Sequence, residues 1–301
     1  MMNMLTLSHV KKRFGDKTVL EDVTFSVPEH TVFGFVGQNG AGKTTTMKII
    51  LGLLEANSGE ITVGGEKVRY GDTPTNRLIG YLPDVPEFYS FMTPKEYLHF
   101  CGELTGMSSS SIKARTTELL ELVGLSNEKR RIKGFSRGMK QRLGIAQALF
   151  NRPRLLICDE PTSSLDPVGR REILDILTAA KEHTTILFST HILSDVERIC
   201  DEVAFLHEGQ IVLQESMEKL KREHASIGYE IELEYPEDTA KLLLAFPSIK
   251  KSNENHLLLE RADQVQTEAV LRFILEHHIP FRRFEKQELS LESLFMEVVS
   301  K

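Results

Sequence analysis

The sequence contains a glycine-rich loop whose residue types and spacing suit phosphate binding, Gly37-x-x-x-x-Gly42-Lys43-Thr44. Glycines let backbone N–H groups close around a phosphate at the positive end of the helix that follows. We expect Lys43 to reach the β- and γ-phosphates of a nucleotide and the Thr44 hydroxyl to bind Mg²⁺. The residues expected to contact the nucleotide in this segment are Gly37, Asn39, Gly40, Ala41, Gly42, Lys43, Thr44 and Thr45.

Two acidic residues, Asp159 and Glu160, end a short apolar run that reads as a buried strand, Leu155–Cys158. In nucleotide-hydrolysing proteins with a phosphate-binding loop, an aspartate in this position holds Mg²⁺. Glu160 is placed to orient or deprotonate the attacking water. The alternative is a pair of surface acids at the end of a strand, and the presence of the phosphate loop favours the catalytic reading.

The elements that must position these residues alternate between strands and helices. Thr31–Val36 is nearly all apolar, as expected for a strand covered on both faces, and it runs directly into the phosphate loop. Residues from about 85 to 150 read as helical, with Thr93 as an N-cap. Strand character returns at Leu155, and Ser194–Glu197 reads as a capping box that starts a later helix. The pattern predicts an α/β core interrupted by a helical insertion.

A second pattern begins after a polar connector, residues 216–227. The expected order from residue 228 to 301 is strand, helix, hairpin, helix, strand and closing helix, which suggests a small ferredoxin-like α+β domain. The hairpin is expected around Asn253–Asn255.

Composition limits the function classes. Of 301 residues, 41% are hydrophobic and 27% charged, and the formal net charge is −6, which is typical of a globular protein rather than a disordered one. The acidic balance argues against a nucleic-acid binder, which usually carries a basic stripe. The three cysteines, Cys101, Cys158 and Cys200, lie far apart, so we expect them to be structural in a reducing compartment.

No apolar run approaches the roughly 20 residues needed to cross a bilayer, and the first residues lack the pattern of a signal peptide. If the protein works at a membrane, we expect another polypeptide to span it. No Asn-Lys-x-Asp guanine motif is present, which argues against a GTPase.

Gly134–Leu143 resembles the signature motif of ABC-transporter ATPases, whose usual form begins Leu-Ser-Gly-Gly-Gln; here the serine and the second glycine are kept as Ser136 and Gly138. Five further pieces match that family in its order, and together the resemblance covers about residues 4–213. They are the two motifs above, Ser164-Leu165-Asp166 as D-loop, Thr190-His191 with the switch histidine, and Phe14 as the aromatic of the A-loop.

The resemblance implies a P-loop (RecA-like) α/β core with an antiparallel β subdomain, in an ATPase domain of residues 1–215 whose helical subdomain spans about 85–150. It also implies a head-to-tail dimer, in which Ser136 and the Gly138 backbone bind the γ-phosphate held by the other subunit. His191 would contact that phosphate and position the water, and Phe14 would stack on adenine. The alternatives are a structural histidine and an ordinary core phenylalanine.

One position departs from the family pattern. The glutamine expected after Ile79–Pro83 is replaced by Asp84. A carboxylate at this position could approach Mg²⁺ or its water, but it lacks the amide donor of glutamine. The aromatic segment that follows, Val85–Met92, faces the transmembrane partner in the family; the alternative is that it forms the core of the helical insertion.

The C-terminal segment Glu288–Phe295 and the Phe135–Met139 form of the signature resemble bacterial drug, antibiotic and sodium exporters. The resemblance implies a homodimer or heterodimer of ATPase subunits and a separate integral-membrane permease. It places the chain in the cytoplasm, peripheral at the inner face of the cell membrane. The alternative is a soluble ABC ATPase that acts on ribosomes or DNA. That reading is weaker, because such translation factors usually carry two cassettes and the DNA-repair type inserts a long coiled coil.

Overall fold

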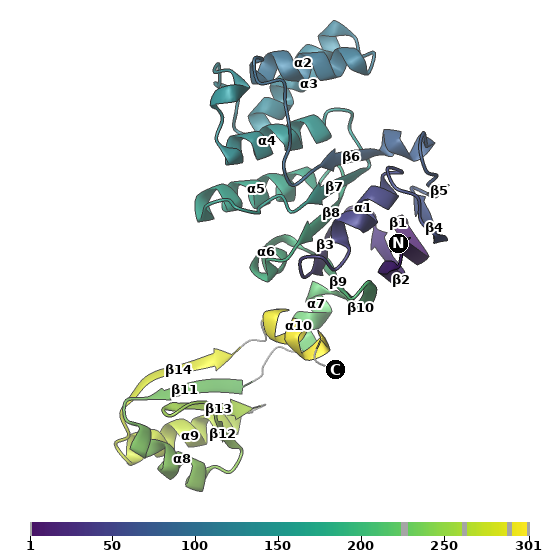
Figure 1. The fold of residues 1–301 in the computed structure, drawn as a ribbon. Coiled ribbons are helices and arrows are strands. Elements are labelled where there is room, and N and C mark those ends of the chain that lie inside the picture. The colour runs from purple at the N-terminus through teal and green to yellow at the C-terminus, as the bar shows by residue number, and fades with distance from the viewer. Residues whose placement is uncertain (1, 224–227, 261–263, 288–290, 300–301) are drawn as a thin grey trace. The chain divides into compact units, whose positions relative to one another are not determined.

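The computed structural model describes residues 2–223, 228–260, 264–287 and 291–299, and it divides into two compact units (Figure 1). Among the described residues, the first unit comprises those up to Met217 together with Val298 and Val299, and the second spans Glu218–Glu297. In the described part of the chain, no helix is both long and apolar enough to cross a membrane.

The first unit is built on a ten-stranded sheet with the strand order β5-β4-β1-β2-β10-β9-β3-β8-β7-β6. Four neighbouring strands in it, β9, β3, β8 and β7, run parallel, and β6 extends that parallel part. β1, β2, β4 and β5 pair antiparallel. The strands are β1 (Asn3–Phe14), β2 (Lys17–Pro28), β3 (Val32–Gly37), β4 (Ser58–Val63), β5 (Glu66–Lys67), β6 (Ile79–Leu82), β7 (Leu155–Asp159), β8 (Thr185–Thr190), β9 (Glu202–His207) and β10 (Gln210–Ser216). The predicted α/β core with an antiparallel β subdomain is confirmed.

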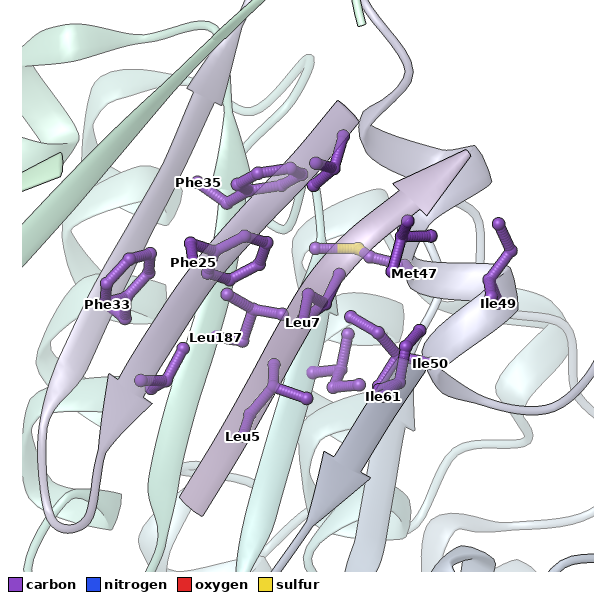
Figure 2. Packing of buried hydrophobic residues seen from close by; sticks show 14 of the residues in the cluster. Leu5, Leu7, Phe25, Phe33, Phe35, Met47, Ile49, Ile50, Ile61 and Leu187 are labelled. Atoms are coloured by element: carbon purple, nitrogen blue, oxygen red, sulfur yellow. The ribbon is translucent and has the colours of Figure 1, made fainter. Parts of the chain in front are cut away.

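Every residue of β3, β7 and β8 is buried, which explains their apolar runs Val32–Val36, Leu155–Cys158 and Ile186–Phe188. The antiparallel strands pack side chains against α1 (Lys43–Ile50) and the face of β3 (Figure 2). Phe25 of β2 stacks on Phe33 and Phe35 of β3, with ring centroids 5.6 and 5.2 Å apart. This core fixes the strand that leads into the phosphate loop.

The helical insertion connects β6 to β7, which are neighbouring parallel strands. It contains α2 (Pro94–Leu104), α3 (Ser109–Leu122) and α4 (Arg137–Ala148); Figure 1 shows α2 and α3 side by side. Thr93 caps α2 as expected, because its hydroxyl accepts from the Glu96 N–H and the Glu96 carboxylate accepts from the Thr93 N–H at 2.8 Å. The insertion is thus a long crossover between two strands of one sheet.

The expected capping box at Ser194 is wrong. Helix α6 (Leu193–Ile199) begins two residues earlier than a Ser194 cap would allow, with Ile192 as its N-cap. The Thr190 hydroxyl accepts from the Ile192 N–H at 2.9 Å and so turns the chain directly after β8. Asp195, in the first turn, instead accepts a hydrogen bond from the Thr162 hydroxyl at 2.7 Å.

Asp166 caps α5 (Pro167–Ala180), as expected, since its carboxylate accepts from the Gly169 N–H at 2.7 Å. The short helix α7 (Met217–Glu223) follows β10 in the chain and spans the boundary between the two units.

The second unit has the element order β-α-β-β-α-β, with a four-stranded antiparallel sheet ordered β12-β13-β11-β14. Its elements are β11 (Gly228–Leu233), α8 (Thr239–Ala245), β12 (Ile249–Lys251), β13 (His256–Glu260), α9 (Gln264–Glu276) and β14 (Phe281–Gln287), followed by α10 (Leu291–Val299). Ile231, Leu257 and Val270 form part of its own core. The ferredoxin-like order is confirmed, whereas Glu288–Ser290 of the closing motif lie outside the described residues.

Candidate functional site

Three adjacent parallel strands, β3, β8 and β7, end at the same edge of the sheet. Gly37 ends β3 and opens the phosphate loop, Asp159 ends β7, and Thr190 ends β8 just before His191. In open α/β sheets, ligands bind outside the carboxyl ends of the strands. The topology therefore brings three of the predicted motifs together.

The loop needs glycine at two of its positions. Gly40 has φ +86° and Gly42 has φ +114°, in the region that L side chains rarely adopt. A Cβ on Gly42 would lie 2.6 Å from Leu20 Cδ2, so a side chain has no room there. The conformation at Gly42 starts α1, whose first residue is Lys43.

Lys43 is buried, with a relative exposure of 6%, and its ammonium group faces oxygen atoms. Nζ donates to the backbone carbonyls of Gly37 at 2.7 Å and Gln38 at 3.3 Å. It also forms an ion pair with Glu160 Oε1 at 3.1 Å. The contact is an ion pair only, since Glu160 Oε1 accepts no hydrogen bond from any described residue. A cation is thus fixed inside the loop that would receive phosphates.

The Asp159 carboxylate is buried and held at both oxygens. Thr44 Oγ1 donates to Oδ2 at 2.8 Å, and Ser189 Oγ donates to Oδ1 at 2.7 Å. Mg²⁺ in nucleotide sites is held by one or two protein oxygens together with phosphate oxygens and waters. The adjacent hydroxyl and carboxylate of Thr44 and Asp159 fit that donor set.

Glu160 lies between the lysine and the histidine. Its Oε2 is 2.8 Å from His191 Nδ1, and its Oε1 faces Lys43. Its backbone adopts φ +49°, a left-handed conformation that is uncommon for a non-glycine residue and that often marks functional sites. The geometry brings these three predicted residues together.

A cleft of about 280 Å³ lies over this group. It is lined by Val19, Asn39, Gly40, Gly42, Lys43, Thr44, Thr45, Asp84, Asp159 and Glu160. Val19 is the member that we did not predict; it precedes Leu20 on β2, and the pairing of the antiparallel subdomain brings it there. The lining thus combines residues of the phosphate loop with Asp159 and Glu160.

Among the residues that the structure describes, six predicted site residues lie outside the lining of this cleft: Phe14, Gly37, Ala41, Ser136, Gly138 and His191. Phe14, at the end of β1, is 49% exposed and has Lys12 Nζ 5.0 Å from its ring centroid. It is therefore not a core residue. Ser136 and Gly138 also do not line the cleft. Ser136 is the N-cap of α4, and its hydroxyl accepts from the Met139 N–H at 3.2 Å.

Asp84 borders the cleft but is tied to the signature helix. Its Oδ1 accepts from Arg137 Nη2 at 3.0 Å, and its backbone carbonyl accepts from Gln141 Nε2 at 2.8 Å. Burial raises the pKa of Asp84 above its ordinary value of 3.8, and Arg137 opposes that rise while Asp159 adds to it. The residue that replaces glutamine thus connects the β6–α2 loop to α4.

Asp84→Asn is expected to change the free energy of unfolding by less than about 1 kcal/mol at neutral pH, because the Asp84–Arg137 pair is nearly half exposed. The raised pKa means that the folded state binds the proton more tightly, so wild-type stability falls as pH rises through the range above 3.8. The Asp84→Asn protein has no carboxyl group at this position, so this fall in stability with rising pH should be absent from it. Denaturant unfolding of both proteins between pH 3 and 7 checks this, and a variant that loses stability more steeply as pH rises would contradict it.

Comparison with known proteins agrees with the site. Residues 20–163 match the family described as ABC transporter, and residues 216–299 match the C-terminal domain of DrrA1-3-like ATP-binding proteins. The uncharacterized ABC transporter ATP-binding protein YxlF of Bacillus subtilis is 38% identical over 98% of this chain and 99% of its own length. The linearmycin resistance ATP-binding protein LnrL of the same organism is 32% identical over 99% of both chains.

A solved ATP-binding subunit of an ABC transporter superimposes with a TM-score of 0.64 and 34% identity, covering 74% of this chain and 93% of that one.

Proposed function

The chain belongs to the ATP-binding proteins of the ABC transporter family, and we propose that it is the ATPase subunit of an exporter that drives a separate transmembrane permease. The observation that carries the proposal is the convergence of Lys43, Thr44, Asp159 and Glu160 on one cleft, with His191 in contact with the Glu160 carboxylate. These groups suit hydrolysis of a bound triphosphate. In this reading the domains are the ATPase at 1–215 and the accessory domain at 228–301.

Each group has a distinct part in the proposed reaction. The loop N–H groups and Lys43 bind the β- and γ-phosphates, and Lys43 offsets the charge that develops as the γ-phosphoryl group leaves. Thr44 and Asp159 would hold Mg²⁺, which supplies charge neutralisation between the phosphates. Glu160 accepts a proton from the attacking water, and His191, 2.8 Å from its Oε2, orients that carboxylate.

The signature residues would complete the site of a second subunit. Ser136 and Gly138 lie at the start of α4, outside the lining of the cleft, and their hydroxyl and N–H groups stand at a helix N-terminus suited to a phosphate. In a head-to-tail dimer they would bind the γ-phosphate held by the partner. ATP then joins the two subunits, and hydrolysis separates them. Such a dimer is either a homodimer or a pair with a homologous ATPase chain.

Phe14 would stack on the adenine. Phe14→Ala is expected to weaken ATP binding by about 1–3 kcal/mol, which is the scale of base–aromatic stacking, and so to raise the Kd about 5- to 150-fold. Because Phe14 is half exposed, the variant should retain its stability, whereas truncating a core phenylalanine costs about 3–5 kcal/mol. Fluorescence titration with a labelled ATP analogue and denaturant unfolding measure the two effects. Unchanged affinity with a large loss of stability would contradict the assignment.

Export as the direction of transport rests on relatives. LnrL, which matches over the whole chain, is a linearmycin resistance protein, and the DrrA-like C-terminal domain accompanies the cassette. In the proposed function the ATPase lies at the inner face of the membrane beside its permease, and the transported compound leaves the cell.

The proposal is tested by capturing partners of the Glu160→Gln protein, loaded with ATP and Mg²⁺, from gently solubilised native membranes, with mass spectrometry as the readout. A polytopic membrane protein, captured with ATP and lost with the Lys43→Ala protein as bait, supports a transporter motor. Ribosomal proteins or nucleic-acid factors would instead support the soluble ABC ATPase and overturn the transport assignment.

A further inference from the structure

We propose that Ser189 is a positioning residue for hydrolysis, which holds both acidic residues of the site through one hydroxyl group. The inference deepens the proposed function and rests on it, since it concerns the carboxylate that would hold Mg²⁺. Sequence patterns do not mark this serine, because it belongs to no motif and follows the apolar run Ile186–Phe188 of β8.

The position of Ser189 follows from the sheet. β7 and β8 are parallel neighbours, and Asp159 is the residue paired with Ser189. The two residues before Ser189 on β8, Leu187 and Phe188, are fully buried and apolar. Ser189 is also fully buried, so its hydroxyl must find its partners within the protein.

The partners are the two acidic residues of the site, Asp159 and Glu160. Ser189 Oγ donates to Asp159 Oδ1 at 2.7 Å and accepts from the Glu160 N–H at 3.1 Å. The Ser189 carbonyl shares the same N–H, also at 3.1 Å. The hydroxyl thus has one donor and one acceptor contact, both to the end of β7.

The first contact fixes the orientation of the Asp159 carboxylate. Ser189 holds Oδ1, and Thr44 holds Oδ2 from the other side, so rotation of the carboxylate about its bond to Cβ would break two hydrogen bonds. Groups that hydrogen-bond a ligating carboxylate orient it, and their loss typically costs about 10- to 100-fold in metal affinity or activity.

The second contact lies at the point where the backbone turns. Glu160 has φ +49°, and its N–H is held by Ser189 at the start of that turn. Strained conformations persist where the surroundings over-determine them. Ser189 therefore also contributes to the direction in which the Glu160 side chain leaves the strand, toward Lys43 and His191.

The matched comparison is Ser189→Ala against Thr185→Val. Thr185 lies at the other end of β8, is also buried, and its hydroxyl accepts from the His30 N–H at 2.9 Å, away from the cleft. Both variants delete one buried hydroxyl from the same strand. A general effect of that deletion on folding should appear in both, whereas an effect on Asp159 should appear in Ser189→Ala alone.

The measurement is the affinity for a non-hydrolysable ATP analogue with Mg²⁺ and with EDTA, followed by the Mg²⁺ concentration that half-saturates ATP hydrolysis. In Ser189→Ala the gain in affinity on adding Mg²⁺ is expected to shrink about 10- to 100-fold. The affinity in EDTA should stay at the wild-type value. Ser189→Cys keeps a weak donor of similar size, so its gain in affinity on adding Mg²⁺ should lie between those of the wild type and Ser189→Ala. This variant replaces Ser189→Ala in the comparison if the Ala protein does not fold.

A wild-type Mg²⁺ dependence in the Ser189 variants, or an equal change in Thr185→Val, would overturn the inference. A wild-type protein whose affinity does not rise with Mg²⁺ would instead contradict the proposed metal site itself, so the two failures are distinguishable.

Discussion

Glu160→Gln is expected to lower the turnover number for ATP about 10²- to 10⁴-fold, the range typical of losing a general base. The amide cannot take the proton of the attacking water, yet it keeps the size of the carboxylate and can still meet His191 Nδ1. The residues that bind phosphate, Lys43 and Thr44, are unchanged. Steady-state hydrolysis and equilibrium nucleotide binding, measured on the same preparation, test the two halves of this expectation.

Nucleotide affinity should stay equal or rise in this variant. In the structure, Glu160 forms an ion pair with Lys43 in a largely buried environment, and neutralising it leaves the ammonium free for phosphate oxygens. Glu182→Gln, at an exposed position, is the control for a general effect of removing one carboxylate. Wild-type turnover in Glu160→Gln would exclude Glu160 as the base.

Lys43→Ala is expected to weaken ATP binding about 100-fold or more. A hydrogen bond to a charged group contributes about 1.5–3 kcal/mol, and Lys43 is expected to bind two phosphate groups. Since about 1.4 kcal/mol corresponds to a factor of ten in Kd, two such contacts account for at least two factors of ten. Isothermal titration with ATP and Mg²⁺ measures the change directly.

Lys48→Ala is the matched control, because Lys48 lies on the same helix α1 with its side chain exposed. It removes one positive charge near the site without touching the cleft, so its ATP affinity should equal that of the wild type. If Lys43→Ala binds ATP as tightly as Lys48→Ala, the phosphate loop assignment is wrong.

The main features of the fold could be predicted from the sequence because local signals agreed with the tertiary structure. The apolar run of β3, the glycine loop and the capping box at Thr93 each specify one local structure, and the α/β core and the ferredoxin-like order are confirmed. Ser194 shows where local reasoning fails. Its capping pattern was outweighed by the Thr190 hydroxyl, which is fixed at the end of β8 and starts the helix earlier.

The site was predictable where chemistry is encoded in a contiguous motif. Residues that strand pairing brings to the site could not be predicted, since the register between strands distant in sequence leaves no local pattern. Ser189 and Val19 are examples: one faces Asp159 across β7 and β8, and the other lines the cleft from β2. Likewise, the sequence shows that Asp84 replaces the expected glutamine. It does not show that the Asp84 carboxylate pairs with Arg137, 53 residues away.

The central claim, that each site combines the phosphate loop of one subunit with the signature of another, is tested most directly by mixing two inactive variants. Lys43→Ala disables the loop. Gly138→Asp places a negative charge where the γ-phosphate would bind; its Cβ would meet Leu165 at 3.9 Å, an ordinary contact, and an acidic residue suits the first turn of α4.

In a mixed head-to-tail dimer both defects fall in one site and the other site is intact. Random pairing makes half of the dimers mixed, so an equal mixture is expected to recover about a quarter of the wild-type ATPase rate if the sites act independently. Each variant alone, and a chain carrying both changes, should stay inactive. A mixture no more active than the sum of its separate components would contradict the composite site.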